Sequence, residues 1–355
     1  MLYGAGTITA LIACLYLLLR RGNAFAPDVT SPLRLRRWTA AFFAILALGH
    51  LWYLPAAIFN SPDAIMLSLL IGGLLDCMTA IPLAAIIMLC MLQDRRRPLW
   101  PVFLLTVPLV VILVVSIATR SYALIPAAHI YFLLLGIGFI IYMVREVRQY
   151  GRWLRDNYAD LEHKEVWQSF VVLAAILLTF GFYVSGAGGM AYEYIIQVCG
   201  LMLICYLLWR VETLSDLSQS GGQTVQDLAQ EPVPMTAETT TPDDIGPLLQ
   251  QYCVDTKLYL QHDLTVAQLA QTIGTNRTYL GQYFARQDTT YNAYINNLRI
   301  NHFISLYREA VAAQRPFSAK NLANDSGYRS YSTFSLAFKQ RMGQSVTAWM
   351  QQSAE

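Results

Sequence analysis

Long apolar runs fill about the first 210 residues of the chain, and the remaining residues mix polar stretches with helical periodicity. Seven runs approach the length of about 20 mostly apolar residues that a helix needs to cross a bilayer, where unpaired backbone groups cannot face lipid. These runs cover residues 2–19, 38–59, 64–92, 99–119, 123–144, 168–187 and 194–209. The pattern predicts an all-α chain whose residues 1–210 form a seven-helix transmembrane bundle.

Basic residues are distributed unevenly between the loops that join these runs. The loops after the first, third and fifth runs hold thirteen arginines and lysines, whereas the alternate loops hold only Arg120. Because basic residues accumulate in cytoplasmic loops, we expect the N-terminus outside and everything after Trp209 in the cytoplasm. The charged loop 145–167 should extend the fifth and sixth helices and offer a surface for contact with the cytoplasmic residues.

A polar segment, residues 211–243, follows the last apolar run. It is rich in Ser, Thr, Gln and acidic residues and contains Pro232, Pro234 and Pro242. A stretch of this composition buries too little apolar surface to offset its chain entropy, so we expect a flexible acidic linker. Its root-mean-square span would be roughly 30 Å. The remaining residues, 244–355, would form a cytoplasmic domain.

A short motif occurs twice in that domain. The sequence from Leu269 to Gly274 reads LAQTIG, and the sequence from Leu322 to Gly327 reads LANDSG. In each copy, Leu and Ala suit a close helix crossing, and the glycine suits the turn that ends a helix. A second helix follows each glycine, with an apolar pair four residues apart that would anchor it to a core. These pairs are Leu280 with Phe284, and Phe334 with Phe338. Two copies in order predict two helix-turn-helix motifs.

Helix-start signals and one long periodic stretch complete this pattern. Thr265 with Gln268 has the spacing of a capping box, and Asn276 and Ser330 suit the N-caps of the two second helices. Between the copies, the stretch from Tyr291 to about Ala313 is helical by period. About 20 helical residues extend roughly 30 Å. Such a helix would hold two recognition helices about 34 Å apart, which is one turn of DNA.

Residues 261–351 resemble the C-terminal DNA-binding domain of AraC/XylS-type transcription regulators, in which a long helix joins two helix-turn-helix motifs. The matching residues are Leu264, Leu269, Ala270, Gly274, Leu280, Phe284, Ile295, Leu298, Arg299, Gly327, Tyr328, Phe334, Phe338, Lys339 and Gly343. Phe303 stands where the family usually has alanine, and Trp349 replaces a common tyrosine, which indicates local repacking. The fusion to membrane spans is similar to a membrane-anchored subgroup of the family.

The resemblance also implies which side chains would face DNA. By position, the candidates for base contact are Thr278, Gln282, Tyr331, Ser332, Thr333 and Leu336. Gln can read adenine, hydroxyl groups can read several bases, and apolar groups can touch the thymine methyl. The candidates for phosphate contact, which position without specifying, are Arg277, Arg286, Arg329, Lys339 and Arg341. Residues 261–351 carry a net charge of +5, so we expect binding that weakens with salt.

Three ionisable residues fall inside the predicted spans, where their cost makes each a candidate for function. Asp76 lies in the third span, His50 in the second and His129 in the fifth. An aspartate paired with a histidine would bind a polar ligand or respond to pH, and would make the membrane region a sensor. The alternative is a structural contact between helices.

Other chemistry has no support in the sequence. The six cysteines form no C-x-x-C or Cys/His pattern, so we expect no disulfide framework and no metal site. No nucleophile triad or phosphate loop is present, so we expect no catalytic residues and no cofactor. All four lysines lie outside the predicted spans, which excludes a retinal Schiff base.

Together these features predict a membrane-bound one-component transcription regulator rather than an enzyme, in the cytoplasmic (inner) membrane of a bacterium. Its partners would be double-stranded promoter DNA and the lipid bilayer. RNA polymerase, a second copy of the chain, and a small-molecule or envelope signal stay open as further partners. The alternative is a transporter or integral membrane enzyme whose C-terminal domain serves regulation or protein contact.

Overall fold

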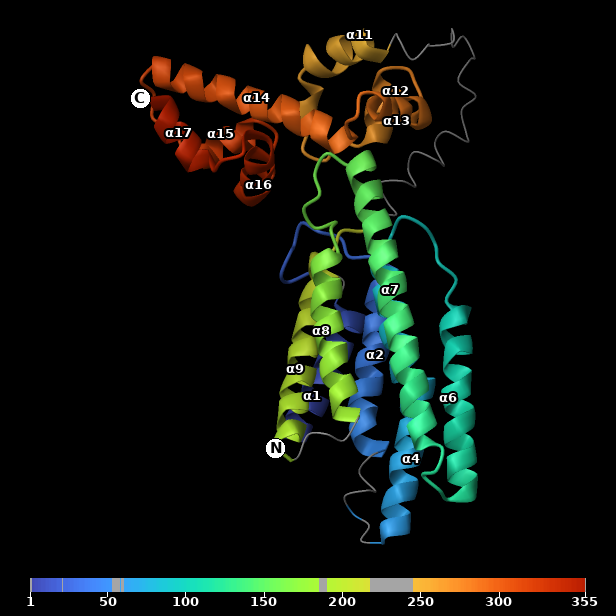
Figure 1. Ribbon diagram of the computed structural model, residues 1–355. Coiled ribbons are helices and arrows are strands. Elements are labelled where there is room, and N and C mark those ends of the chain that lie inside the picture. The colour runs from blue at the N-terminus through green and yellow to red at the C-terminus, as the bar shows by residue number, and fades with distance from the viewer. Residues whose placement is uncertain are drawn as a thin grey trace. The chain divides into compact units, whose positions relative to one another are not determined.

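The computed structural model describes residues 2–20, 22–52, 58, 61–184, 190–217 and 245–354. Within these residues every regular element is a helix, apart from an isolated antiparallel bridge between Tyr158 and Thr265 (Figure 1). This confirms the expected all-α class. The chain divides into two compact units. The first contains the described residues up to Tyr150 and those from Val166 onward to 217, and the second contains Gly151–Glu165 with the residues from 245 onward.

The first unit is built from the long apolar helices. In chain order its described helices are α1 (Leu2–Leu19), α2 (Leu33–Trp52), α4 (Pro62–Met78), α5 (Ala80–Met91), α6 (Trp100–Thr119), α7 (Ile125–Asn157), α8 (Trp167–Val184) and α9 (Met190–Thr213). The last residues of α7 belong to the second unit. By length and composition, four described stretches can cross a membrane, namely Pro62–Met91, Trp100–Thr119, Ile125–Asn157 and Tyr194–Thr213. The count of seven spans remains a prediction.

Apolar side chains cover the outside of these helices. Leu133 and Leu134 on α7 are both 62% exposed, and Leu104 on α6 is 58% exposed. A water-soluble protein rarely leaves a large apolar surface uncovered. Inward-facing side chains such as Leu70 and Leu113 form a small core between α4, α6 and α7. The apolar outside is therefore what a helical bundle in lipid requires.

The third apolar run is broken near its middle. α4 ends at Met78 and α5 begins at Ala80, and the backbone of Thr79 between them has φ −127° and ψ −71°. Pro82 lacks an amide proton, and its ring crowds the carbonyl four residues earlier, which is that of Met78. Two helices therefore form where the hydrophobic pattern shows one run, 64–92.

Buried polar groups join the ends of α1 and α9. Glu212 at the end of α9 is fully buried. Its carboxylate accepts hydrogen bonds from the Ala24 and Phe25 amides, at 2.8 and 3.0 Å, and another from the Tyr16 hydroxyl. Residues 211–217, which the sequence assigns to the linker, are largely buried here. The rest of the expected linker lies outside the described residues.

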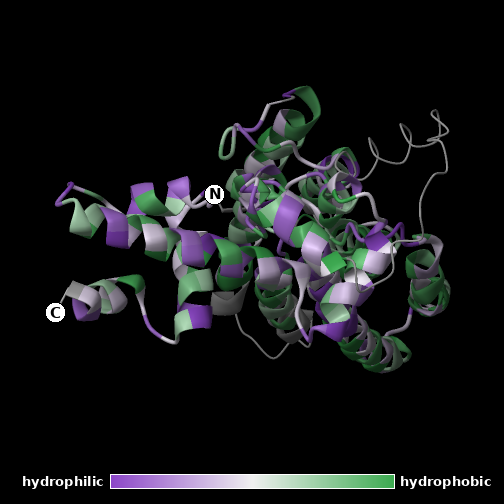
Figure 2. Cartoon of the chain, turned by 90° about the horizontal axis from the view of Figure 1, so that it is seen from above, coloured by the Kyte–Doolittle hydropathy of each residue, from purple (hydrophilic) through white to green (hydrophobic). Residues whose placement is uncertain are grey.

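The second unit holds the C-terminal helices, which mix polar and apolar residues (Figure 2). They are α11 (Ile245–Leu249), a π-helical turn (Gln250–Val254), a 3-10 turn (Leu258–Leu260), α12 (Val266–Thr272), α13 (Arg277–Arg286), α14 (Tyr291–Ala312), α15 (Ala319–Asp325), α16 (Tyr331–Met342) and α17 (Val346–Ala354). The long helix expected between residues 291 and 313 is confirmed in α14.

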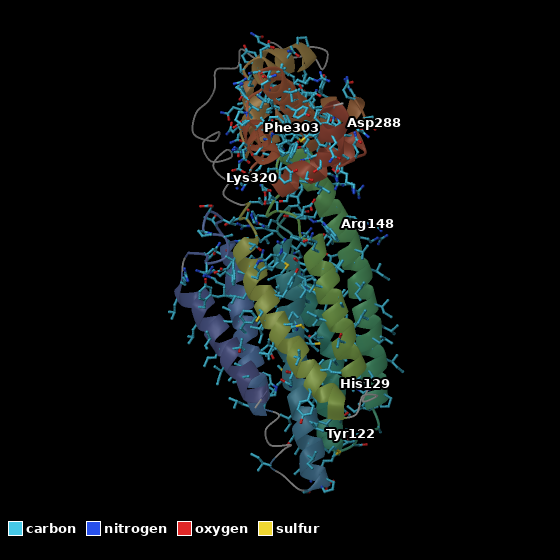
Figure 3. The ribbon with its side chains drawn as sticks, turned by 90° about the vertical axis from the view of Figure 1, so that its left-hand side faces the viewer. Tyr122, His129, Arg148, Asp288, Phe303 and Lys320 are labelled. Atoms are coloured by element: carbon cyan, nitrogen blue, oxygen red, sulfur yellow. The ribbon has the colours of Figure 1, made fainter. Side chains whose placement is uncertain are left out.

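Two hydrophobic cores share α14. Tyr291 and Ile295 from its first half pack with α12 and α13, and Phe303 from its second half packs with α15, α16 and α17. Phe303 (Figure 3) is fully buried. Its ring centroid lies 4.4 Å from that of Phe334 and 6.4 Å from that of Trp349. The large ring in place of the family's alanine is thus accommodated by aromatic packing, as expected.

Candidate nucleic-acid interface

Side-chain caps and a glycine turn build the first helix-turn-helix motif, which consists of α12 and α13. Thr265 and Gln268 form the expected capping box at the start of α12, with the Thr265 hydroxyl accepting from the Gln268 amide at 3.2 Å. Gly274 in the turn has φ +74°, a conformation that glycine adopts without a steric penalty. Asn276 then accepts a hydrogen bond from the Tyr279 amide at 2.9 Å and starts α13.

The second motif, α15 and α16, repeats this construction. Gly327 has φ +88°, and a Cβ at this position would lie 2.8 Å from backbone atoms of Leu260. Ser330 caps α16 by accepting from the Thr333 amide at 3.3 Å. The residues that match the first motif are buried, namely Leu322, Ala323, Phe334 and Phe338. The sequence repeat is therefore a structural repeat.

Arg299 in α14 ties the loop before the first motif to the second motif. Its side chain is only 1% exposed and donates to the carbonyls of Tyr259 at 2.7 Å and Gln261 at 2.8 Å. The guanidinium carbon lies 5.5 Å from the centroid of the Tyr328 ring. Burial lowers the pKa of Arg299 from its usual value, and the nearby Tyr328 opposes that shift. One buried cation thus links both motifs to the helix that joins them.

The candidates for base contact divide into two groups by exposure. Thr278 and Gln282 on α13, and Ser332 and Leu336 on α16, are exposed, and the apolar side chain of Leu336 is 59% exposed. An exposed apolar group on a recognition helix can touch a thymine methyl. The remaining two candidates, Tyr331 and Thr333, are half-buried. The assignment of all six to base contact stays a prediction.

The phosphate candidates also differ from one another. Arg277, Arg286 and Lys339 are exposed side chains. Arg329 forms an ion pair with Asp263. Arg341 donates to the Asn297 carbonyl and to Asn301 Oδ1, the latter at 2.9 Å. The first three are thus more readily available to a DNA backbone than the last two, and the contacts themselves remain predictions.

A segment from outside the C-terminal sequence packs against the first motif. This segment, residues 158–165, follows α7 and belongs to the second unit. The Ala159 amide donates to the Leu264 carbonyl at 3.2 Å, and the Asn292 amide group on α14 donates to the Ala159 carbonyl at 2.7 Å. Ala159 is 2% exposed and lies in the core of the first motif. We call residues 158–165 the docked segment.

The far part of the docked segment reaches the second motif. The Thr333 hydroxyl of α16 donates to Glu162 Oε2 at 3.0 Å. The Lys164 ammonium lies 3.9 Å from Asp263, which is also the partner of Arg329. Burial lowers the pKa of Lys164, while the nearby carboxylates, Asp160 first, oppose that shift. The Glu162 carboxylate of the docked segment is therefore hydrogen-bonded to Thr333, a side chain that the family resemblance assigns to base contact.

Two of the three membrane candidates have described side chains. Asp76 on α4 is half-buried, whereas His129 is exposed in the second turn of α7, near Tyr122 (Figure 3). No hydrogen bond or ion pair joins the two among the described side chains. His50 lies in α2, and its side chain is outside the described set. Their sensing role remains a prediction.

Sequence reasoning expected contact between loop 145–167 and the C-terminal residues but did not identify its partners. Glu162 and Asp263, which engage DNA-contact candidates, were not distinguished from other surface charges. The only signal was the high density of charged residues in this loop. Pairing between residues 171 positions apart, as for Glu162 and Thr333, follows from the tertiary fold and not from a local pattern.

Comparison with known proteins bears on the C-terminal residues. A family model described as "Helix-turn-helix domain" matches residues 269–352. This range begins in α12 of the first motif and ends in α17, so it includes both recognition helices. No curated protein and no solved structure matches the chain.

Proposed function

We propose that this chain is a membrane-bound one-component transcription regulator of the AraC type, because a helix-turn-helix family model matches residues 269–352. In this proposal the C-terminal domain binds promoter DNA sequence-specifically, and the apolar helices of the first unit anchor it to a bacterial cytoplasmic membrane. Seven spans with the N-terminus outside would put the DNA-binding domain in the cytoplasm. The unequal distribution of loop arginines supports that orientation.

The observation that carries the proposal is the pair of capped helix-turn-helix motifs on one long helix. α14 has 22 residues, which corresponds to about 33 Å at 1.5 Å per residue. One turn of DNA is about 34 Å long. A helix of this length suits two recognition helices, α13 and α16, that enter consecutive major grooves on one face of a duplex.

The docked segment supports a link between the membrane and DNA binding. It is continuous in the chain with α7 and α8 of the first unit, and Glu162 accepts a hydrogen bond from Thr333 of α16. While Glu162 stays there, the Thr333 hydroxyl cannot donate its proton to a base, and the carboxylate repels the phosphates of DNA. We therefore propose that release of the docked segment accompanies full DNA binding, and that the membrane region controls the release.

Asp76 is the membrane residue that we propose as part of the sensor, because an ionisable group inside a span is costly and needs a reason. Replacing it by asparagine keeps its shape and removes its charge. D76N should change how expression of a target gene responds to the inducing condition and leave the affinity for DNA unaltered. An unchanged response in cells would remove Asp76 from the sensor.

Selection of DNA sequences by the full-length protein tests the proposed function. The protein is reconstituted in lipid nanodiscs and used to select from random duplexes, followed by sequencing. We expect one enriched site with two half-sites about 10 base pairs apart. Gln282→Ala on α13 should relax the preference at one position, whereas Gln271→Ala on α12 should not.

Failure to enrich any sequence, with wild-type protein that is folded and monodisperse, would contradict the regulator proposal. Enrichment that is identical for the wild type and for both variants would instead contradict the role of Gln282. The matched glutamine on the first helix of the motif controls for loss of a polar surface side chain, because Gln271 is exposed as Gln282 is.

A further inference from the structure

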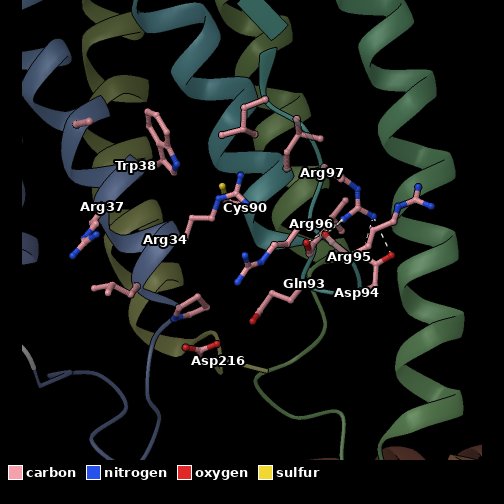
Figure 4. Close-up of a pocket in the computed structure, with 16 residues that line it drawn as sticks. Arg34, Arg37, Trp38, Cys90, Gln93, Asp94, Arg95, Arg96, Arg97 and Asp216 are labelled. Carbon is pink, nitrogen blue, oxygen red and sulfur yellow. Dashed lines mark hydrogen bonds and ion pairs between the residues drawn. The ribbon is translucent and has the colours of Figure 1, made fainter. Parts of the chain in front are cut away.

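A cavity of about 840 Å³ opens in the first unit between α2, the end of α5 and the loop after α5 (Figure 4). This volume lies in the range of about 300–1,000 Å³ that is typical of sites for small ligands. All of its lining residues belong to the first unit. The lining includes five arginines and two carboxylates, Asp94 and Asp216, which leave a formal lining charge of +3.

Two of the five arginines hold the loop in place. Arg97 is buried and forms ion pairs with Asp94 at 2.8 Å and with Glu146 of α7 at 2.7 Å. Arg95 also pairs with Glu146, at 2.8 Å. The charges of these two arginines are therefore compensated by the protein, and their ion pairs fix the wall that carries Arg96.

The other three arginines have no such compensation. Arg34 and Arg37 on α2, and Arg96 on the loop, have exposed side chains, and no ion pair or hydrogen bond joins them to another described residue. Arg34 and Arg96 extend from opposite walls toward the space between α2 and the loop (Figure 4). Guanidinium groups present several N–H donors in a planar fork that fits phosphate and carboxylate oxygens. An anion between these walls would satisfy donors from both.

The rest of the cavity is apolar. Leu33 and Trp38 from α2, Leu89 from α5 and Leu99 from the loop contribute to its lining. A bare inorganic anion would contact the arginines and leave this apolar wall uncovered. A ligand with a phosphate group and a hydrocarbon portion would use both parts of the lining.

We propose that this cavity binds a phosphate-bearing amphiphile, namely the headgroup and upper acyl chain of an anionic phospholipid. In the proposed orientation, α2 begins and α5 ends at the cytoplasmic surface, where basic pockets between membrane helices meet anionic headgroups. The inference rests on the membrane location in the proposed function and is independent of DNA binding. Free phosphate shares the same chemistry and is separated from lipid by the experiment.

Native mass spectrometry of the full-length protein tests this inference. Detergent-solubilised protein is mixed with equimolar phosphatidylglycerol and phosphatidylcholine, and the bound lipids are counted with and without 10-fold excess inorganic phosphate. Wild-type protein should retain phosphatidylglycerol in preference to phosphatidylcholine. The double variant Arg34→Gln with Arg96→Gln should lower that preference roughly tenfold. The control, Arg145→Gln with Arg148→Gln, removes two exposed charges from α7 outside the cavity and should behave as wild type.

The outcomes separate the ligand sources. Arginine-dependent retention of phosphatidylglycerol that phosphate does not displace supports the lipid. Displacement by phosphate, together with a phosphate-induced rise in melting temperature that only the cavity variant loses, would overturn the lipid and assign a soluble ligand. Equal retention by the wild type and both double variants would overturn the site. If the double variant is not monodisperse, the single variants R34Q and R96Q serve for the same comparison.

DNA selection by the same preparations keeps this inference distinct from the proposed function. A cavity variant that loses lipid preference and still selects the wild-type DNA site supports both. If the wild-type protein retains phosphatidylglycerol as expected but enriches no DNA sequence, only the regulator proposal is contradicted.

Discussion

Replacing Glu162 by alanine should strengthen binding of the full-length protein to DNA. In the docked segment, Glu162 Oε2 accepts a hydrogen bond of 3.0 Å from the Thr333 hydroxyl on the second recognition helix. The alanine removes that bond and also removes a carboxylate from the face that would meet DNA phosphates. The other contacts of the docked segment, such as the bond from Asn292 to Ala159, remain in place.

The size of the effect follows from the kind of hydrogen bond that is lost. A hydrogen bond to a charged group contributes about 1.5–3 kcal/mol. Glu162 and Thr333 are both half-buried, so solvent weakens the interaction and the low end, about 1.5 kcal/mol, applies. Since about 1.4 kcal/mol corresponds to a factor of ten, E162A should lower the Kd for DNA roughly tenfold. E162Q keeps an acceptor and should give a smaller gain.

Fluorescence anisotropy with a duplex selected by the wild-type protein measures this change in nanodiscs. Asp156→Asn is the matched control, because it removes one negative charge from an exposed position on the last turns of α7, and no hydrogen bond or ion pair joins Asp156 to a described residue of α16. An E162A affinity equal to that of the wild type would refute the inhibitory contact. Weaker binding by E162A would show that the docked segment supports the DNA-bound conformation.

Three further predictions concern the DNA-binding unit. Gly327→Ala should lower the free energy of unfolding of this unit by about 2–5 kcal/mol, since a Cβ would lie 2.8 Å from the Leu260 backbone at φ +88°. Gly274 has φ +74° but open space around a Cβ, so Gly274→Ala should lower the free energy of unfolding by only about 1–2 kcal/mol. Pulse proteolysis in urea compares the stabilities of the two variants. Equal losses of stability would contradict the close contact between position 327 and the Leu260 backbone. Arg299→Met should lower the free energy of unfolding by about 3 kcal/mol in the same assay, because it removes buried hydrogen bonds to the Tyr259 and Gln261 carbonyls. The control Arg308→Gln, at an exposed position on α14, should leave the stability almost unchanged. Arg286→Gln should reduce the slope of log affinity against log salt by about one, and an unchanged slope would remove Arg286 from the phosphate contacts.

The DNA-binding part was predictable from sequence because its signals are local. Caps such as Thr265 and Asn276 act within three residues, and the positive φ of Gly274 is a property of a single residue. The apolar pairs four residues apart needed only helical periodicity to identify them as core. Local preference and tertiary packing agree at these positions, so a short window of sequence is sufficient.

The contacts of the docked segment could not be predicted in the same way. Glu162 and Thr333 are 171 positions apart, and each is an ordinary surface residue in its own sequence neighbourhood. The break at Thr79 does not show in the hydropathy of run 64–92 for a different reason, because hydropathy counts Pro82 as a position in an apolar run and ignores the hydrogen bond that it cannot donate. The cavity arginines looked like loop charges that orient spans, and only the fold brings α2 and the loop after α5 together.

Chromatin immunoprecipitation with sequencing, applied to the intact protein in its native cells, tests the central claim most directly. The account predicts discrete promoter sites for the wild type. A variant with Gln282→Ala and Ser332→Ala, present in the membrane at the same level, should lose these sites. Absence of discrete wild-type sites above the background of cells that lack the protein would contradict the account, and would favour a transporter or membrane enzyme with a regulatory C-terminal domain. Equal enrichment of discrete sites by the wild type and the variant would instead contradict the roles of Gln282 and Ser332.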